Sequence, residues 1–518
     1  MIDAYRACDT WTGALLCFSV VFAPWAFGAT QQWSVWLLNL IGYALGALLF
    51  AKRLLARRAR LRPPRHTDLA AAIAGRSRSR SRRTTRTDRA LTALMVVLTV
   101  ALLLYCLVAA MNARASRVAY SWSLTYHEGY LPWLPHSYER GASWAAFWAY
   151  LGLAGAFWAA RDWLRGLTLK EESELQAARE AAERQDGPPQ PSAAAHEAAQ
   201  ARRYRLPGRL YRFLTVVCFS GGLLALEGVA QRWTGSDSLL GLVQPRFNQS
   251  GSNQFGPFAN RNNAAEYLNL VWPVCAGLAW LRVRERRRAK RRGWHWRGRD
   301  HLWLPPCAFL MAAAPYLILS RGGVLVNAGL LVAMGLLLAI ANHGHHWRVH
   351  LGAVLVVLLI AQAAVVGGYD ALLARFETMF VDDLSGRGEL YENAQQMVAD
   401  HPWYGTGPWT FSTIYQFYRL NEVQEWAGYA HDDWLELRIT FGAVGLGLIL
   451  ILLAAVLLRW WFATGPPVHW IVPATIMVGM GGCLAHARFD LPFCVHSLVL
   501  TFLLWGAALT AFGRRQAA

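Results

Sequence analysis

Long apolar runs recur along the whole chain, and they constrain its fold more than any other feature. Each run is roughly 18 to 22 residues long, the length that a helix needs to cross about 30 Å of hydrocarbon. Hydrophobic residues make up 55% of the 518 residues and charged residues only 16%, which is unlike a soluble domain. We therefore predict an all-α fold, a polytopic membrane bundle of about twelve transmembrane helices.

The predicted spans are separated by polar or charged connectors. They lie near residues 11–28, 33–51, 90–111, 142–160, 213–231, 263–281, 302–320, 322–342, 351–369, 437–458, 469–487 and 493–512. The first span is expected to be retained, because no cleavage site of small residues follows it and a second span comes at once.

Lys and Arg give the chain a formal net charge of +19, and their excess is confined to a few connectors and the C-terminus. These are residues 52–66, 75–89, 161–212, 282–299 and 513–515. By the positive-inside rule they are cytoplasmic, so both termini are expected inside. Nucleic-acid binding is not expected, because the charge does not lie on an aromatic-interleaved domain.

Residues 370–436 form the only long segment predicted on the outward side. Carboxylates outnumber its three arginines, Arg375, Arg387 and Arg419. Within the segment, residues 385–402 predict a helix that ends at a proline. The aromatic glycine turn "WYGTGPWTF" (403–411) follows. Its aromatic faces suit sugar rings, or alternatively pack the loop on the bilayer surface.

These segments resemble one known family. The runs at 385–419, "HDDWLEL" (431–437) and "FGAVGLG" (441–447) look like the large periplasmic loop and following helix of the O-antigen ligase and O-antigen polymerase family. Upstream, "GPFANRNNAAEYLNL" (256–270) and "LSRGGVL" (319–325) resemble its two other recurrent segments, in the same order. The resemblance covers roughly residues 213–500. One departure is Asp432, where the family commonly has Asn.

The resemblance implies an enzyme of the bacterial inner membrane with its active site facing the periplasm. Such an enzyme transfers a glycan from undecaprenyl pyrophosphate to a hydroxyl of lipid A core or of a growing polysaccharide. No cofactor is expected, and a clamp of arginines on the pyrophosphate would make a metal unnecessary. We divide the chain into N-terminal membrane helices (1–212) and a ligase-like core (213–518) with its periplasmic loop at 370–436. The expected partners are the lipid-linked glycan, its acceptor and membrane lipid.

A departing pyrophosphate needs fixed cations, and the planar fork of arginine suits phosphate oxygens. Arg321 and Arg261 are the candidates for this catalytic role, with Arg246 in reserve. Arg321 could instead be an interfacial anchor that snorkels to headgroups. The neighbouring Asn260, Asn262 and Asn263 either hold sugar hydroxyls or cap the helix that starts there.

The attacking hydroxyl needs a base, and His431 is the candidate. Asp432 and Glu436 lie four residues apart, hence on one helical face beside it. Two alternatives stay open. Asp432 and Asp433 could simply cap the helix, or His431, Asp432 and Glu436 could bind a divalent ion.

Further substrate contacts are expected from Arg387 and Tyr404 of the loop and from Arg488. Arg488 stands in a second outward corner, "HARFDLP" (486–492), with His486 and Asp490. These groups either line the same cavity or form a local Arg488–Asp490 pair.

Two other functions compete with the ligase or polymerase prediction. A transporter or flippase of lipid-linked glycans would also need outward cations, although no internal repeat is evident. A protein O-oligosaccharyltransferase would share the organisation but accept a Ser or Thr side chain. The sequence does not separate these acceptors.

Overall fold

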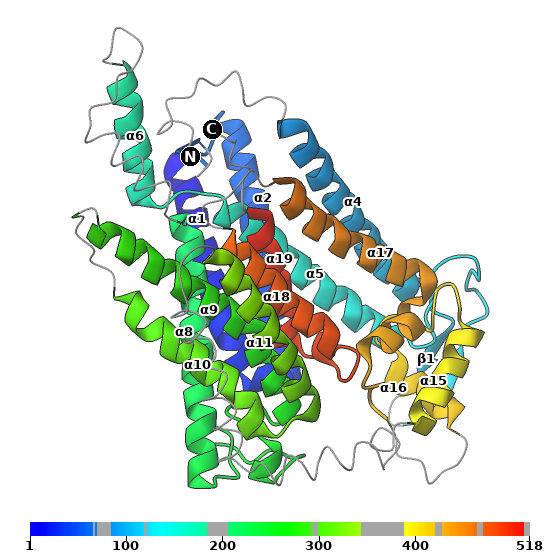
Figure 1. Ribbon diagram of the computed structural model, residues 1–518. Coiled ribbons are helices and arrows are strands. Elements are labelled where there is room, and N and C mark those ends of the chain that lie inside the picture. Colours follow the sequence, from blue (N-terminus) through cyan, green and yellow to red (C-terminus); the bar gives the residue numbers. More distant parts are fainter. Residues whose placement is uncertain are drawn as a thin grey trace.

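The computed structural model consists almost entirely of helices (Figure 1). It describes residues 1–65, 68–69, 84–118, 121, 123–183, 206–291, 293, 299–342, 388–419, 427–463 and 470–511. The long helices are α1 (Ile2–Trp25), α2 (Gln32–Arg58), α4 (Thr84–Met111), α5 (Arg140–Leu164), α8 (Gly208–Thr234), α9 (Arg261–Arg291), α10 (Asp300–Ile318), α11 (Arg321–Ala341), α17 (Asp433–Ala463), α18 (Ile471–His486) and α19 (His496–Ala511).

Every predicted span within the described residues overlaps one of these helices, and the predicted span 351–369 lies outside them. Among the described helices, seven are long and apolar enough to cross a membrane. They are Ile2–Trp25, Gln32–Arg58, Asp88–Met111, Gly208–Thr234, Asp300–Ile318, Arg321–Ala341 and Asp433–Trp460. Helices α18 and α19 are apolar but shorter. The helical membrane fold is therefore confirmed, while the number of twelve spans stays a prediction.

The two ends of the bundle differ (Figure 1). The start of α1, the end of α19 and α6 (Leu169–Glu183) lie at one end, which we call the terminal end. The short elements α15 (Gly388–Asp400), α16 (Phe411–Ile414) and β1 (Ala115–Arg117) gather at the other, which we call the loop end.

Helix α9 forms the centre of one half of the bundle. It packs against α8, α10, α11, α18 and α19, and its residues from Asn263 to Val274 are all buried. Because so many helices surround it, the start of α9 is held firmly at the loop end.

The loop end carries a small folded unit, which we call the loop lobe (residues 112–139 and 388–419). Strands β1 and β2 (Leu124–Tyr126) pair antiparallel in it. Helix α15, predicted from its spacing, buries Ala394 and Met397 against Phe411 and Ile414. The backbone N–H of Tyr138 donates to the carbonyl of residue 406 at 2.8 Å, which joins the two parts. The described residues 388–419 of the predicted loop therefore share this end with residues 112–139, a second connector that the prediction of one long outward segment did not include.

A kink in α17 docks the glycine turn of the loop lobe. Gly442 has φ 61° inside the helix, and a Cβ there would lie 2.3 Å from the Trp403 carbonyl oxygen. The freed backbone groups pair with the turn: the N–H of Ala443 donates to Pro402 O at 3.0 Å, and that of Thr406 to Ile439 O at 2.9 Å. Only glycine tolerates this approach, so the two glycine-rich motifs fit each other.

Candidate functional site

His431 lies immediately before α17 and faces a carboxylate from another corner of the chain. Its Nδ1 is 3.1 Å from Oδ1 of Asp490. The His431 side chain is 36% exposed, whereas that of Asp490 is only 4% exposed. A buried carboxylate at Nδ1 fixes the tautomer that keeps the proton there, which leaves the lone pair of Nε2 for a substrate. The pair therefore has the geometry of a general base with its orienting group.

Asp490 is itself held from α9. The Asn262 side-chain amide donates to its second oxygen, Oδ2, at 2.7 Å. Asn260 accepts from the backbone N–H of Asn262 at 2.9 Å, as a helix cap does. Asn263 points into the bundle and is buried. Asn260 thus caps the helix, Asn262 supports Asp490, and Asn263 lies in the interior.

The backbone at His431 adopts a strained conformation, with φ 52°. Two contacts hold it. Tyr391 of α15 donates to the His431 carbonyl at 3.4 Å, and the preceding N–H, of Ala430, donates to Glu436 Oε2 at 2.9 Å. Glu436 therefore acts on His431 through the backbone, so it fixes where the imidazole starts.

Asp432 caps α17 by accepting from the backbone N–H groups of Trp434 at 3.1 Å and Leu435 at 3.2 Å. Its other oxygen pairs with Arg488, whose side chain is 60% exposed. Burial raises the pKa of the Asp432 carboxyl, against the opposing effects of the Leu435 N–H and the Arg488 guanidinium. Arg488 pairs with Asp432 and not with Asp490, so the alternative of a local Arg488–Asp490 pair is wrong.

Asp433 lies under the site and does not face it. Its carboxylate accepts from the N–H of Phe493 at 2.6 Å, and the thiol of Cys494 lies 3.4 Å from it and 3.6 Å from Glu436. The three side chains considered for a divalent ion have separate partners: His431 contacts Asp490, Asp432 contacts Arg488, and Glu436 accepts from the N–H of Ala430. In the part of the chain that the structure describes, no three His, Cys, Asp or Glu side chains gather to hold a metal ion.

The two candidate arginines stand at the same end of the bundle. Leu319, with φ 58°, separates α10 from α11, and Arg321 is the first residue of α11, after its cap Ser320. A Cβ on the next residue, Gly322, would lie 3.0 Å from Nε2 of His486, so Arg321 starts its helix against the corner that carries Arg488.

Arg261 starts α9 next to Asn262, and its guanidinium donates to the Ser252 carbonyl at 3.1 Å. Arg246, the reserve candidate, is exposed in the segment between α8 and α9. Arg261 thus precedes Asn262, which contacts Asp490, while its own guanidinium turns to Ser252.

Tyr404 is occupied by the loop lobe. Its hydroxyl donates to the Trp133 carbonyl at 2.8 Å, and its own carbonyl accepts from the Tyr105 hydroxyl at 2.7 Å. A substrate contact for Tyr404 stays a prediction. Arg387, the other predicted contact from the loop, lies outside the described residues.

A buried contact between His486 and Glu266 lies at this corner, and sequence reasoning missed Glu266. His486 Nε2 lies 3.5 Å from Oε1 of Glu266, and both side chains are buried. Neither carboxylate oxygen of Glu266 has a hydrogen-bond partner among the described residues. The signal was available, because a single glutamate within the apolar run "AAEYLNLVWPV" is unusual in a span.

Residues 306–450 match the family model for O-antigen ligase. The chain carries an O-antigen ligase domain. The match supports the O-antigen ligase and polymerase assignment that the motifs predict, and with it a glycan-transferring membrane enzyme of polysaccharide biosynthesis. The family and the apolar helices together support a multi-pass protein of the bacterial inner membrane. Comparison with curated protein sequences gives no match.

The ligase domain as matched includes Arg321 and His431 but stops before the corner at 486–492. Arg261 and Asn262 also lie outside it. The fold nevertheless brings these outside residues to the site, because Asn262 contacts Asp490 and Asp490 contacts His431.

Proposed function

We propose that the chain is a metal-independent glycosyltransferase that moves a glycan from undecaprenyl pyrophosphate to a hydroxyl acceptor on the periplasmic face. The acceptor is lipid A core or a growing polysaccharide. The observation that carries this proposal is the His431–Asp490 pair, which stands partly exposed and in hydrogen-bonding distance at 3.1 Å.

In the proposed reaction Nε2 of His431 accepts the proton of the acceptor hydroxyl. The hydroxyl oxygen forms a bond to the anomeric carbon, and the bond between that carbon and the pyrophosphate oxygen breaks. The electron pair leaves with the lipid pyrophosphate. Asp490 stays ionised and stabilises the imidazolium that forms, as a buried carboxylate at Nδ1 does in hydrolytic triads.

The departing pyrophosphate would be met by arginines. Arg321 and Arg261 begin two helices at the loop end, where backbone N–H groups also favour an anion. Arg488, mostly exposed beside Asp432, could bind a third phosphate oxygen or a sugar acid. These three arginines, two at helix starts and one beside Asp432, support an anionic leaving group.

The lipid chain of such a donor needs an apolar groove. One lies between α17 and α18, and it is lined by Leu453, Leu457, Leu458, Trp460, Met477, Met480, Gly481 and Leu484. Its lining reaches the site, because the Leu484 carbonyl accepts from the indole N–H of Trp434 at 3.0 Å, three residues after His431. A polyprenyl chain in this groove would leave its pyrophosphate near Arg488.

The charge pattern supports a periplasmic loop end. Helix α2 ends in Arg57 and Arg58, and α9 ends in Arg288, Lys290 and Arg291, away from the loop lobe. Positive connectors remain in the cytoplasm. The division into membrane helices at 1–212 and a ligase core at 213–518 belongs to the same proposal, and the matched stretch 306–450 falls within the second part.

The test is transfer by the purified protein in liposomes, with undecaprenyl-pyrophosphate glycan and candidate glycan, lipid and peptide acceptors, each with and without EDTA. His431→Ala is expected to bind the donor normally and to lose transfer by a factor of the order of 10² to 10⁴, as for a positioned base. His127→Ala is the matched control, because His127 hydrogen-bonds Ser116 in the loop lobe, away from the pair.

Each competing function gives a different result in this assay. A flippase moves the lipid-linked glycan and forms no glycosidic bond. A protein O-oligosaccharyltransferase glycosylates the peptide in place of the glycan. A metal-dependent enzyme stops in EDTA and recovers with a divalent ion. Full transfer by His431→Ala would refute the proposed base.

A further inference from the structure

A cluster of three arginines, two of them buried, lies at the opposite end of the bundle from His431. It consists of Arg161 near the end of α5, Arg165 just after it, Arg459 near the end of α17, and one carboxylate, Asp88 of α4; we call it the arginine cluster. The relative exposed area is 4% for Arg161 and 2% for Arg459. Two guanidiniums are therefore almost removed from water.

Asp88 serves more than one arginine. One of its oxygens pairs with Arg459, and the other lies 3.6 Å from Arg165. Arg459 also donates to the carbonyl of Thr510. A single carboxylate thus shares its charge between two cations.

Arg161 has no carboxylate within ion-pair distance among the described residues. Its guanidinium donates to the Thr92 hydroxyl at 2.7 Å and stacks at 5.4 Å from the ring of Trp158. Arg165 and Arg459 stand close enough to repel it electrostatically, and Asp88 attracts it from beyond ion-pair distance. The Nε atoms of Arg161 and Arg459 are buried without a hydrogen-bond partner in the described part of the chain.

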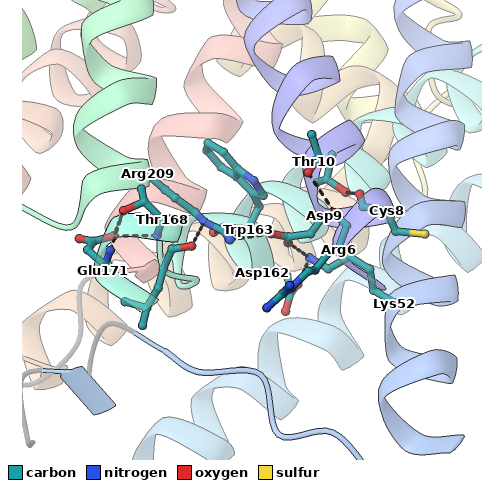
Figure 2. Close-up of polar contacts among 12 residues, drawn as sticks. Arg6, Cys8, Asp9, Thr10, Lys52, Asp162, Trp163, Thr168, Glu171 and Arg209 are labelled. Atoms are coloured by element: carbon teal, nitrogen blue, oxygen red, sulfur yellow. Dashed lines mark hydrogen bonds and ion pairs between the residues drawn. The ribbon is translucent and has the colours of Figure 1, made fainter. Parts of the chain in front are cut away.

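A neighbouring ion network at the same end shows how the fold pairs its other cations (Figure 2). Buried Lys52 lies 2.5 Å from Asp9 and 2.9 Å from Asp162. Arg209 lies 2.6 Å from Asp9, and Arg65 lies 2.8 Å from Asp162. Each cation of that network touches a carboxylate, so the absence of one at Arg161 distinguishes the arginine cluster.

Asp162, the carboxylate next to Arg161 in the sequence, is already paired with Lys52 and Arg65. Residues 69–87, before Asp88, contain only basic and uncharged side chains, and so do 460–470 and 512–518, which follow Arg459 and Thr510. None of these stretches offers the cluster a second carboxylate.

A buried guanidinium keeps its charge, and an uncompensated charge in a low-dielectric interior is strongly unfavourable. Phosphate is the matching anion, because its oxygens accept paired hydrogen bonds from the arginine fork. The side chains of Arg165 and Asp88 are 29% and 36% exposed, so they mark the side of the cluster that is open to water, beside the buried Arg161 and Arg459. Basic pockets between membrane helices characteristically bind anionic lipid headgroups.

We propose that the arginine cluster is a phosphate-binding site that takes the headgroup of an anionic membrane lipid. The site is separate from the transferase site, so it stands or falls independently of the proposed reaction. A bound phosphate would join α4, α5 and α17, of which α17 also carries the His431 end.

The test measures the thermal midpoint of delipidated protein in detergent, with added phosphatidylglycerol, phosphatidylcholine or inorganic phosphate at matched ionic strength. Phosphatidylglycerol is expected to raise the midpoint of the wild type. Arg161→Gln should weaken this binding by about tenfold or more, because it loses both charge and fork. Arg179→Gln, an exposed arginine on α6, is the control and should respond like the wild type.

A second variant covers the case in which Arg161→Gln does not fold. Asp88→Asn removes the only described carboxylate of the cluster, so it should bind phosphatidylglycerol more tightly than the wild type. If millimolar inorganic phosphate raises the midpoint as much as phosphatidylglycerol does, the phosphate-binding site is supported and its ligand is the free anion. The proposal is overturned if phosphatidylglycerol acts no better than phosphatidylcholine, or if Asp88→Asn leaves binding unchanged or weaker.

Discussion

Asp490 lies 3.1 Å from the imidazole of His431, although 59 positions separate the two residues in the sequence. The first prediction follows from this contact. Asp490→Asn keeps the shape of the side chain but favours the wrong tautomer of His431, because an amide can donate to Nδ1. We expect transfer to fall by a factor of the order of 10² to 10⁴ with donor binding preserved.

The measurement is single-turnover transfer at several pH values. Asp400→Asn is the matched control, since Asp400 accepts from Tyr418 in the loop lobe and does not reach His431. Asn262→Ala should give a smaller loss, because it removes one hydrogen bond to the charged Asp490, a contact of about 1.5–3 kcal/mol. Equal activity of Asp490→Asn and the wild type would mean that the pair is structural.

The second prediction concerns the leaving group. Arg321→Lys should insert and fold normally but lose most transfer, because lysine keeps the charge and loses the bidentate fork. Arg179→Lys, an exposed arginine on α6 at the terminal end, should be close to wild type. Product formation at saturating donor distinguishes the two variants. Near-normal transfer by Arg321→Lys would make Arg321 an interfacial anchor.

The third prediction concerns the joint between the bundle and the loop lobe. The Tyr105 hydroxyl lies 2.7 Å from the carbonyl of Tyr404 and 2.8 Å from that of Phe441, on the two sides of the docked turn. Tyr105→Phe removes the donor of these two carbonyls, which should lower the free energy of unfolding by about 1–3 kcal/mol. We expect a lower thermal midpoint and faster proteolysis of the loop lobe.

Tyr43→Phe is the comparison for this variant, because the Tyr43 hydroxyl makes one bond, to the Trp148 carbonyl, at a more exposed position. It should lower the midpoint less than Tyr105→Phe. If both variants behave alike, the docked turn does not depend on Tyr105.

Local patterns predicted the helices and several parts of the site. Apolar spacing gives α15 and the spans, and an aspartate before an apolar run gives the cap that Asp432 forms on α17. The motif resemblance gives the ligase family, which the match at 306–450 supports. These features depend on residues that are close together in the chain, so they can be predicted from a single sequence.

Pairings between distant segments could not be predicted in the same way. Helical spacing placed Asp432 and Glu436 on one face, but Asp432 stands before the helix and turns to Arg488, while Glu436 holds the N–H of Ala430. Asp490, the partner of His431, lies in a turn after α18. Asn262, which donates to Asp490, lies in α9. Such contacts depend on how the helices pack against one another. Hydrophobic periodicity and charge distribution along the sequence do not determine that packing.

The last prediction uses the pH dependence of Asp432. Its pKa in the folded protein is raised by burial, so the folded state binds the carboxyl proton more strongly than the unfolded state does. The stability that this group contributes is therefore present below its unfolded pKa, about 3.9, and is lost as the pH rises through the folded pKa. Asparagine mimics the neutral carboxyl and can still cap α17.

Asp432→Asn should consequently have a free energy of unfolding equal to or above that of the wild type at pH 7, with the difference vanishing toward pH 4. Asp432→Ala removes the cap and should lose about 0.5–2 kcal/mol at both pH values. The measurement is thermal or denaturant unfolding in detergent between pH 4 and pH 8. If Asp432→Asn loses as much stability at pH 7 as Asp432→Ala, the ionised pair with Arg488 outweighs burial, and the carboxylate charge at this position stabilises the fold.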